Sequence, residues 1–147
     1  MKALRIVLAT LTISIFATSC KKEAKRDTTE KFISEFKAAQ AKGIDEVMKL
    51  VYKKDQIPEK FLKIAKESLK SDDSLKVKSI TTKKFDDKDY DKNVEMLKKA
   101  KMKLPVKPTH NLVIEYEPTD KVTDAKSEYT IAKVEGQFYI IAPIKAE

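Results

Sequence analysis

Few side chains in this chain are of the types that carry chemistry, namely nucleophiles, general bases and metal ligands. Its 147 residues include one histidine, His110, and one cysteine, Cys20, too few for a zinc site built from these ligands. Asp87, Asp89 and Asp91 match positions 1, 3 and 5 of a calcium-binding loop, but lysines occupy positions 6 and 12, where Gly and Glu are required. The three carboxylates therefore indicate a solvated loop, and the sequence predicts no metal site.

His110 is the only candidate for an imidazole general base. No serine and carboxylate lie at a spacing that would mark a catalytic triad with it. A single His at the start of a predicted strand is usually an exposed or structural residue. The chain has only two glycines, Gly43 and Gly136, and therefore no glycine-rich phosphate-binding loop. We expect neither a catalytic residue nor a cofactor.

The N-terminus has the composition of a secretory signal peptide. Lys2 and Arg5 precede a run of apolar residues, Ile6–Ala17, which is followed by small residues. The run is too short to span a hydrocarbon core about 30 Å thick, which needs about 20 residues. Residues 1–19 are therefore predicted to be removed on export.

Ala17-Thr-Ser-Cys20 resembles the lipobox of bacterial lipoproteins, in which the chain is cut before the cysteine, here between Ser19 and Cys20. The same small residues also fit an ordinary cleavage site, which would leave a free thiol. A lone cysteine cannot form an internal disulfide, so its place at the cleavage site favours lipidation of Cys20 over a free thiol. The resemblance implies a diacylglycerol thioether and an amide-linked acyl chain such as palmitate. Two or more acyl chains anchor a protein stably to a membrane that it does not span.

The sequence after the cut favours the cell envelope. Removal of Lys2 and Arg5 with the signal peptide lowers the formal net charge by two, from +8 to +6. Residues 20–27 have no apolar periodicity and are predicted to form a tether, either a soluble spacer or a basic segment that contacts anionic head groups. In the enterobacterial pattern, an Asp directly after the lipidated Cys retains a lipoprotein in the inner membrane. Lys21 stands there, so the resemblance implies the outer membrane, facing the periplasm.

The basic charge does not indicate a nucleic-acid partner. Arg5 and Arg26 are the only arginines, both predicted to lie outside the folded domain, and export separates the chain from nucleic acid. Lysines interleaved with acids are typical of a solvated surface. One segment is a candidate contact for anionic lipid or an envelope polymer, through Lys98, Lys99, Lys101, Lys103 and Lys107.

Residues 28–147 are predicted to form a single domain that opens with helices. Asp27 and Glu30 resemble an N-terminal capping pair, and helical spacing through Phe36 continues to a stop at Gly43. A short second helix follows, and Pro58 suits the first turn of a third. The apolar residues that share one face of this third helix are Phe61, Ile64, Ala65 and Leu69. Such stripes favour core packing over a partner-binding groove.

The second half of the domain has the period of strands. Strands are predicted near residues 75–82, 112–117, 127–131 and 137–142, the last two joined by a tight turn. Asp91 is a candidate cap for a lysine-rich helix between the first two strands. Helices followed by an antiparallel sheet indicate the α+β class.

Two further patterns support a family resemblance. The closing turn Lys133-Val-Glu-Gly-Gln-Phe-Tyr-Ile140 and the Phe-x-x-Phe-x-x-Ala helix within Thr29–Val51 look like those of small secreted lipoproteins of the nuclear transport factor 2-like superfamily. The resemblance implies two or three N-terminal helices packed on a curved antiparallel sheet, which forms a cone with an apolar mouth. Tyr116, Tyr129 and Tyr139 lie on predicted strands and are candidates to line that cavity.

The sequence therefore predicts a membrane-anchored, non-catalytic domain that binds an envelope protein or a small ligand. One alternative is a small enzyme, because some relatives in the resembled family are isomerases or dehydratases that use Asp, Tyr or His in the cone. Another is a peripheral binder of anionic envelope material through the lysine-rich segment. Buried, convergent acids and tyrosines would favour the enzyme, and a filled, apolar cone would favour the interaction domain.

Overall fold

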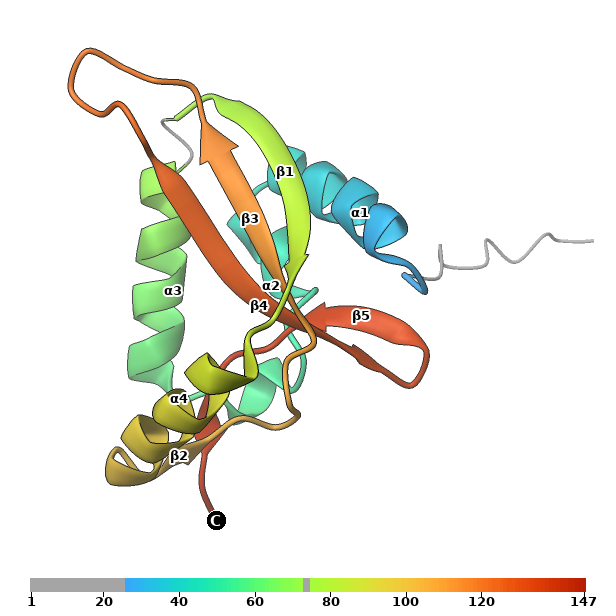
Figure 1. The fold of residues 1–147 in the computed structure, drawn as a ribbon, viewed down its shortest axis with the longest axis vertical. Helices are drawn as coiled ribbons and strands as arrows, with labels where there is room; N and C mark the ends of the chain where they lie inside the picture. Colours follow the sequence, from blue (N-terminus) through green and yellow to red (C-terminus); the bar gives the residue numbers. More distant parts are fainter. Residues whose placement is uncertain (1–25, 73–74) are drawn as a thin grey trace, which may run out of the picture.

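The computed structural model describes residues 26–72 and 75–147 (Figure 1). The predicted signal peptide, the predicted Ser19–Cys20 cleavage site and the predicted tether up to residue 25 lie outside the described residues, as does the side chain of Leu69. Within these described ranges, no helix has both the length and the apolar character needed to cross a membrane.

The predicted α+β class is confirmed: helices come first and an antiparallel sheet of four strands follows. The elements in chain order are α1 (Thr29–Lys42), α2 (Ile44–Met48), the 3-10 helix η1 (Lys54–Gln56), α3 (Glu59–Asp72), β1 (Val77–Lys84), α4 (Asp87–Lys99), β2 (Met102–Lys103), β3 (His110–Tyr116), β4 (Lys126–Val134), β5 (Gln137–Ile140) and β6 (Ile144–Lys145).

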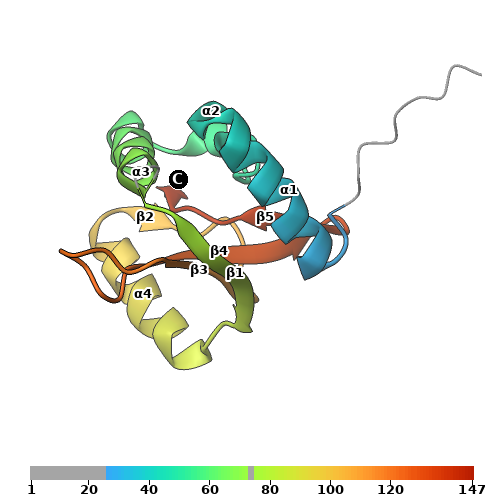
Figure 2. The same ribbon diagram turned by 90° about the horizontal axis from the view of Figure 1, so that it is seen from above.

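The main sheet has the strand order β1-β3-β4-β5, and all of its pairs are antiparallel. Figure 2 shows α1, α2 and α3 on one face of this sheet and α4 on the other. Strands β2 and β6 form a separate two-stranded ladder. The turn between β4 and β5 places Glu135 and Gly136 at φ 49° and 82°, the positive values that a two-residue hairpin turn needs.

The N-terminal caps of α1 and α4 differ from the predicted ones, by one residue and by five residues. Thr28, not Asp27, caps α1, because the Thr28 hydroxyl accepts a hydrogen bond from the Lys31 N–H at 3.3 Å. Asp27 instead pairs with the Lys31 ammonium at 2.8 Å. Asp86, not Asp91, caps α4 by accepting from the Lys88 N–H at 2.9 Å. The three aspartates of the calcium-like pattern therefore lie within the first turns of α4, in a helix rather than the predicted loop.

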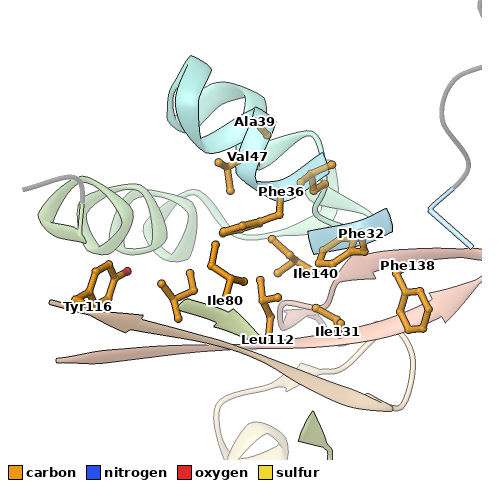
Figure 3. Close-up of a cluster of buried hydrophobic side chains, with 12 residues drawn as sticks. Phe32, Phe36, Ala39, Val47, Ile80, Leu112, Tyr116, Ile131, Phe138 and Ile140 are labelled. Carbon is orange, nitrogen blue, oxygen red and sulfur yellow. The ribbon is translucent and has the colours of Figure 1, made fainter. Parts of the chain in front are cut away.

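The core lies between α1 and the sheet. Phe32 and Phe36 project from α1 and are fully buried against Leu112 of β3 and Ile131 of β4 (Figure 3). The Phe36 ring lies 6.2 Å from that of Tyr129 on β4. This is the packing that the helical spacing predicts, because residues four apart share one face of a helix.

Candidate binding groove

An apolar groove with a volume of about 340 Å³ separates α3 from the end of the sheet where β4 and β5 part. Its walls come from α2, α3, β4 and the chain after β5. The lining side chains are mostly aliphatic or aromatic: Val47, Met48, Val51, Ile57, Phe61, Leu62, Ile64, Ala65, Tyr129, Ile140, Ile141, Ala142 and Pro143. A concave surface of this size and composition is the usual form of a site for an apolar ligand.

The groove opens where β5 leaves β4. The Ile141 N–H donates to the Thr130 carbonyl at 2.8 Å, and the Thr130 hydroxyl donates to the Ile141 carbonyl at 2.8 Å. After this pair the chain turns away through Ala142 and Pro143, whereas β4 runs on in the other direction to Lys126. One side of β4 is therefore left beside α3 and the groove.

The other wall of the groove is the apolar stripe of α3. Phe61 is 41% exposed and Ile64 is 49% exposed, so the prediction that this stripe packs in the core is wrong for these two side chains. Helix α3 is joined to the rest of the domain at its start, where Ile57 is buried, and by an ion pair of 3.2 Å between Lys66 and Asp45 of α2. Its middle turns remain apart from the sheet and leave the groove between them.

Polar groups contribute little to the groove. Besides the backbone of β4, the lining includes the side chain of Tyr129. The side chains of Glu128 and Thr130 lie on the opposite face of the sheet, where Glu128 forms an ion pair of 2.7 Å with Lys83. Among the described residues, no three His, Cys, Asp or Glu side chains lie close enough to hold a metal ion. The lining of the groove is therefore suited to hydrophobic contacts and to backbone hydrogen bonds.

The three tyrosines predicted to line a cavity do not come together. Tyr129 lines the groove, half-buried, between Phe36 and α3. Tyr116 is buried in the core at the far end of β3. Tyr139 packs against Tyr52 and Arg26, outside the groove, with ring centroids 5.5 Å apart for the two tyrosines. Of the three candidates, Tyr129 therefore lines this groove, whereas Tyr116 lines a separate hollow beside Pro118 and Lys126.

Arg26 is part of the domain, although it lies within residues 20–27, which were predicted to form the tether. Its guanidinium carbon lies 4.5 Å from the Tyr139 ring centroid, and its two terminal nitrogens lie 3.3 Å from Glu35 and from Gln137. Its carbonyl also accepts from the Phe138 N–H at 2.7 Å. Because Gln137 and Phe138 are distant in sequence, no local pattern around Arg26 could reveal these contacts. We refer to these interactions as the Arg26 clamp.

The lysine-rich segment lies at the end of α4 and on β2, away from the groove. Lys107 differs from the other four lysines: it pairs with Asp87 at 2.8 Å and lies 5.2 Å from the Tyr90 ring centroid. The hydrogen bond with Asp87 raises the pKa of Lys107. Within the described residues no ion pair involves the exposed side chains of Lys98, Lys99, Lys101 and Lys103.

His110 begins β3, as expected, and it contacts a chain neighbour and one distant aromatic ring. Its Nδ1 lies 3.0 Å from the Thr109 hydroxyl, and its ring meets that of Phe138 edge-on at 5.8 Å. Both contacts are of the kind that holds a structural histidine in place.

Comparison with known proteins yields no relative: no protein-family model, no curated protein and no solved structure matches this chain. The fold and the groove therefore rest on the sequence and the structure alone.

Proposed function

We propose that this chain is a lipid-anchored protein of the bacterial envelope, whose domain binds an apolar partner in the groove between α3 and the sheet without catalysing a reaction. The observation that carries the proposal is the exposure of Phe61 and Ile64 on a concave, almost wholly apolar surface. Contiguous apolar side chains left open to water in this way mark interaction sites.

The anchor in this proposal is Cys20, lipidated and held at the outer membrane on its periplasmic side. The Arg26 clamp supports an anchored arrangement, because it leaves five residues, 21–25, between Cys20 and Arg26, a reach of about 20 Å when extended. In Figures 1 and 2 the chain enters the domain beside the start of α1, and α3 stands at the opposite side. The clamp would thus hold the groove away from the lipid and open to the periplasm.

The nuclear transport factor 2-like fold is also part of the proposal. It is supported by three helices on one face of an antiparallel sheet, with the apolar groove where the mouth of a cone would be. A second candidate function is contact with anionic envelope material. The four exposed lysines of the segment around β2 favour it, since no ion pair among the described residues neutralises them.

Site-specific photocrosslinking in cells that make the full chain tests the groove. A photoreactive residue at position 64 is compared with one at position 96, because Met96 is also apolar and is 55% exposed, but lies on α4. We expect adducts from position 64 that disappear when Phe61→Asp is added, and few from position 96. Equal crosslinking from both positions would contradict the groove as the binding site.

A further inference from the structure

We propose that the groove receives an extended polypeptide segment, which adds to the open edge of β4 as a further strand and inserts alternate apolar side chains between α3 and the sheet. This inference rests on the proposed function and deepens it, because it names the class of partner that the groove binds.

The first argument is the open backbone of β4. On the β3 side, the Tyr116 N–H donates to the Ala125 carbonyl at 3.1 Å, so alternate residues from 125 onwards direct their backbone groups to β3. Lys126 and Glu128 therefore direct theirs the other way, since successive residues of a strand alternate. Among residues 26–72 and 75–147, pairing on that side begins with Thr130, and no strand lies beside Lys126 or Glu128.

The second argument is that the other edges of the main sheet are protected. The outer edge of β5 is covered, because Phe138 donates to Arg26 and Ile140 exchanges hydrogen bonds of 2.9 Å with Leu50 and Tyr52. The outer strand β1 carries several lysines, and charged side chains discourage pairing with another chain. The edge of β4 differs from both, because it borders an apolar groove.

The third argument is the difference between the two faces beside that edge. Tyr129 and Ile140 face the groove together with the apolar stripe of α3. On the opposite face, Glu128 pairs with Lys83 and accepts from the Asn111 amide at 3.5 Å. A strand placed here would have one apolar and one polar side, so the segment should carry apolar residues at every second position.

These features favour a polypeptide over an acyl chain. Both would fill the apolar walls, but an acyl chain has no groups that could hydrogen-bond with the backbone of Glu128. A groove of about 340 Å³ holds a few side chains, so the backbone bonds would supply the rest of the recognition. A second copy of this chain would use the same edge and is distinguished from a separate partner by the test below.

The test uses the mature lipidated chain in lipid nanodiscs and a synthetic peptide of about eight residues, a typical strand length, with Val alternating with Thr, Ser and Lys. Two forms of the peptide are N-methylated, one at its apolar and one at its polar positions. Only one of these sets can face β4; in an antiparallel pairing it is the polar set. Dodecanoate serves as the acyl-chain probe, and hydrogen exchange at residues 126–130 reports on the edge.

We expect the parent peptide to bind, to slow exchange at Glu128, and to lose affinity about tenfold in one N-methylated form but not in the other, because two or more hydrogen bonds are removed. Ile64→Asp should abolish binding, and Val122→Asp, at an apolar side chain that is 43% exposed in the loop before β4, should not. Equal binding of both N-methylated forms, or binding without protection of Glu128, would overturn strand addition.

Further outcomes distinguish strand addition from the more general proposal that the groove binds an apolar partner. Binding of dodecanoate alone, lost in Ile64→Asp, would overturn strand addition and keep the groove as a binding site. Protection of Glu128 without peptide that rises with the density of chains in the nanodisc would identify a second copy as the occupant and would also overturn the proposal. If neither probe binds and Phe61→Asp leaves the crosslinking from position 64 in cells unchanged, the proposed function itself fails.

Discussion

Truncation of Phe36 measures how much of the fold depends on the contact between α1 and the sheet. The side chain is fully buried and packs on Phe32 and Tyr129. A buried aromatic side chain removes about 150–250 Å² from water, worth about 25 cal/mol per Å², and alanine recovers a small part of it. Phe36→Ala should therefore lower the free energy of unfolding by about 3–5 kcal/mol, the range found for Phe in other cores.

Urea denaturation followed by circular dichroism gives this free energy, and an unchanged slope would show that the unfolded state is the same. Phe61→Ala is the matched control, because it removes the same atoms from a side chain that is 41% exposed. We expect it to lose less than half as much stability as Phe36→Ala. A loss below about 1 kcal/mol for Phe36→Ala, or similar losses for both variants, would refute the assignment of α1 to the core and of α3 to the groove.

The remaining predictions concern the anchor, the clamp, an ion pair and the histidine. Cys20→Ser should leave the precursor uncleaved and unlabelled by radioactive palmitate, and labelling that persists would contradict lipidation. Arg26→Ala should lower the free energy of unfolding by about 2 kcal/mol, and Arg26→Lys should recover only part of it, because lysine cannot form the two-pronged contact with Glu35 and Gln137. The hydrogen bond from Lys126 lowers the pKa of Glu115. This hydrogen bond therefore stabilises the fold above the ordinary carboxyl pKa, and the stabilisation is lost as the pH falls through the lowered value. Urea midpoints measured from pH 6 to pH 3 should fall less for Glu115→Gln than for the parent protein. His110→Ala should complement a deletion strain at normal protein levels, and loss of complementation by a folded, lipidated variant would contradict the non-catalytic proposal.

Local sequence patterns predicted most elements of the fold. Helical spacing located α1 and its stop at Gly43, and alternation located β3 and β4, because these signals depend on residues a few positions apart. They failed where the result depends on distant parts of the chain. The stripe on α3 has the same period as that on α1, and no local feature shows that the sheet under α3 is incomplete. Apart from Glu35, the residues of the Arg26 clamp lie more than a hundred positions away, so composition alone assigned Arg26 to the tether.

The candidate site was predictable only in part, for the same reason. Tyr129 was one of three tyrosines that the family resemblance made candidates for a cavity, and it lines the groove. The open edge of β4 was not predicted, because it exists only where the chain after β5 stops pairing with β4 at Thr130. Pro143 does indicate that β5 ends early, since proline lacks the N–H that a longer β5 would need.

Helices α1 and α3 therefore have different roles, although both carry an apolar stripe with the same helical period. The stripe of α1 meets a complete, four-stranded surface and is buried, so it contributes to stability. The stripe of α3 meets the part of the sheet from which β5 is missing, so Phe61 and Ile64 remain in contact with water. An added strand would complete the sheet at that point and would bury these side chains as the sheet already buries Phe36. Binding at the groove would thus extend the sheet under α3 with a strand from another chain.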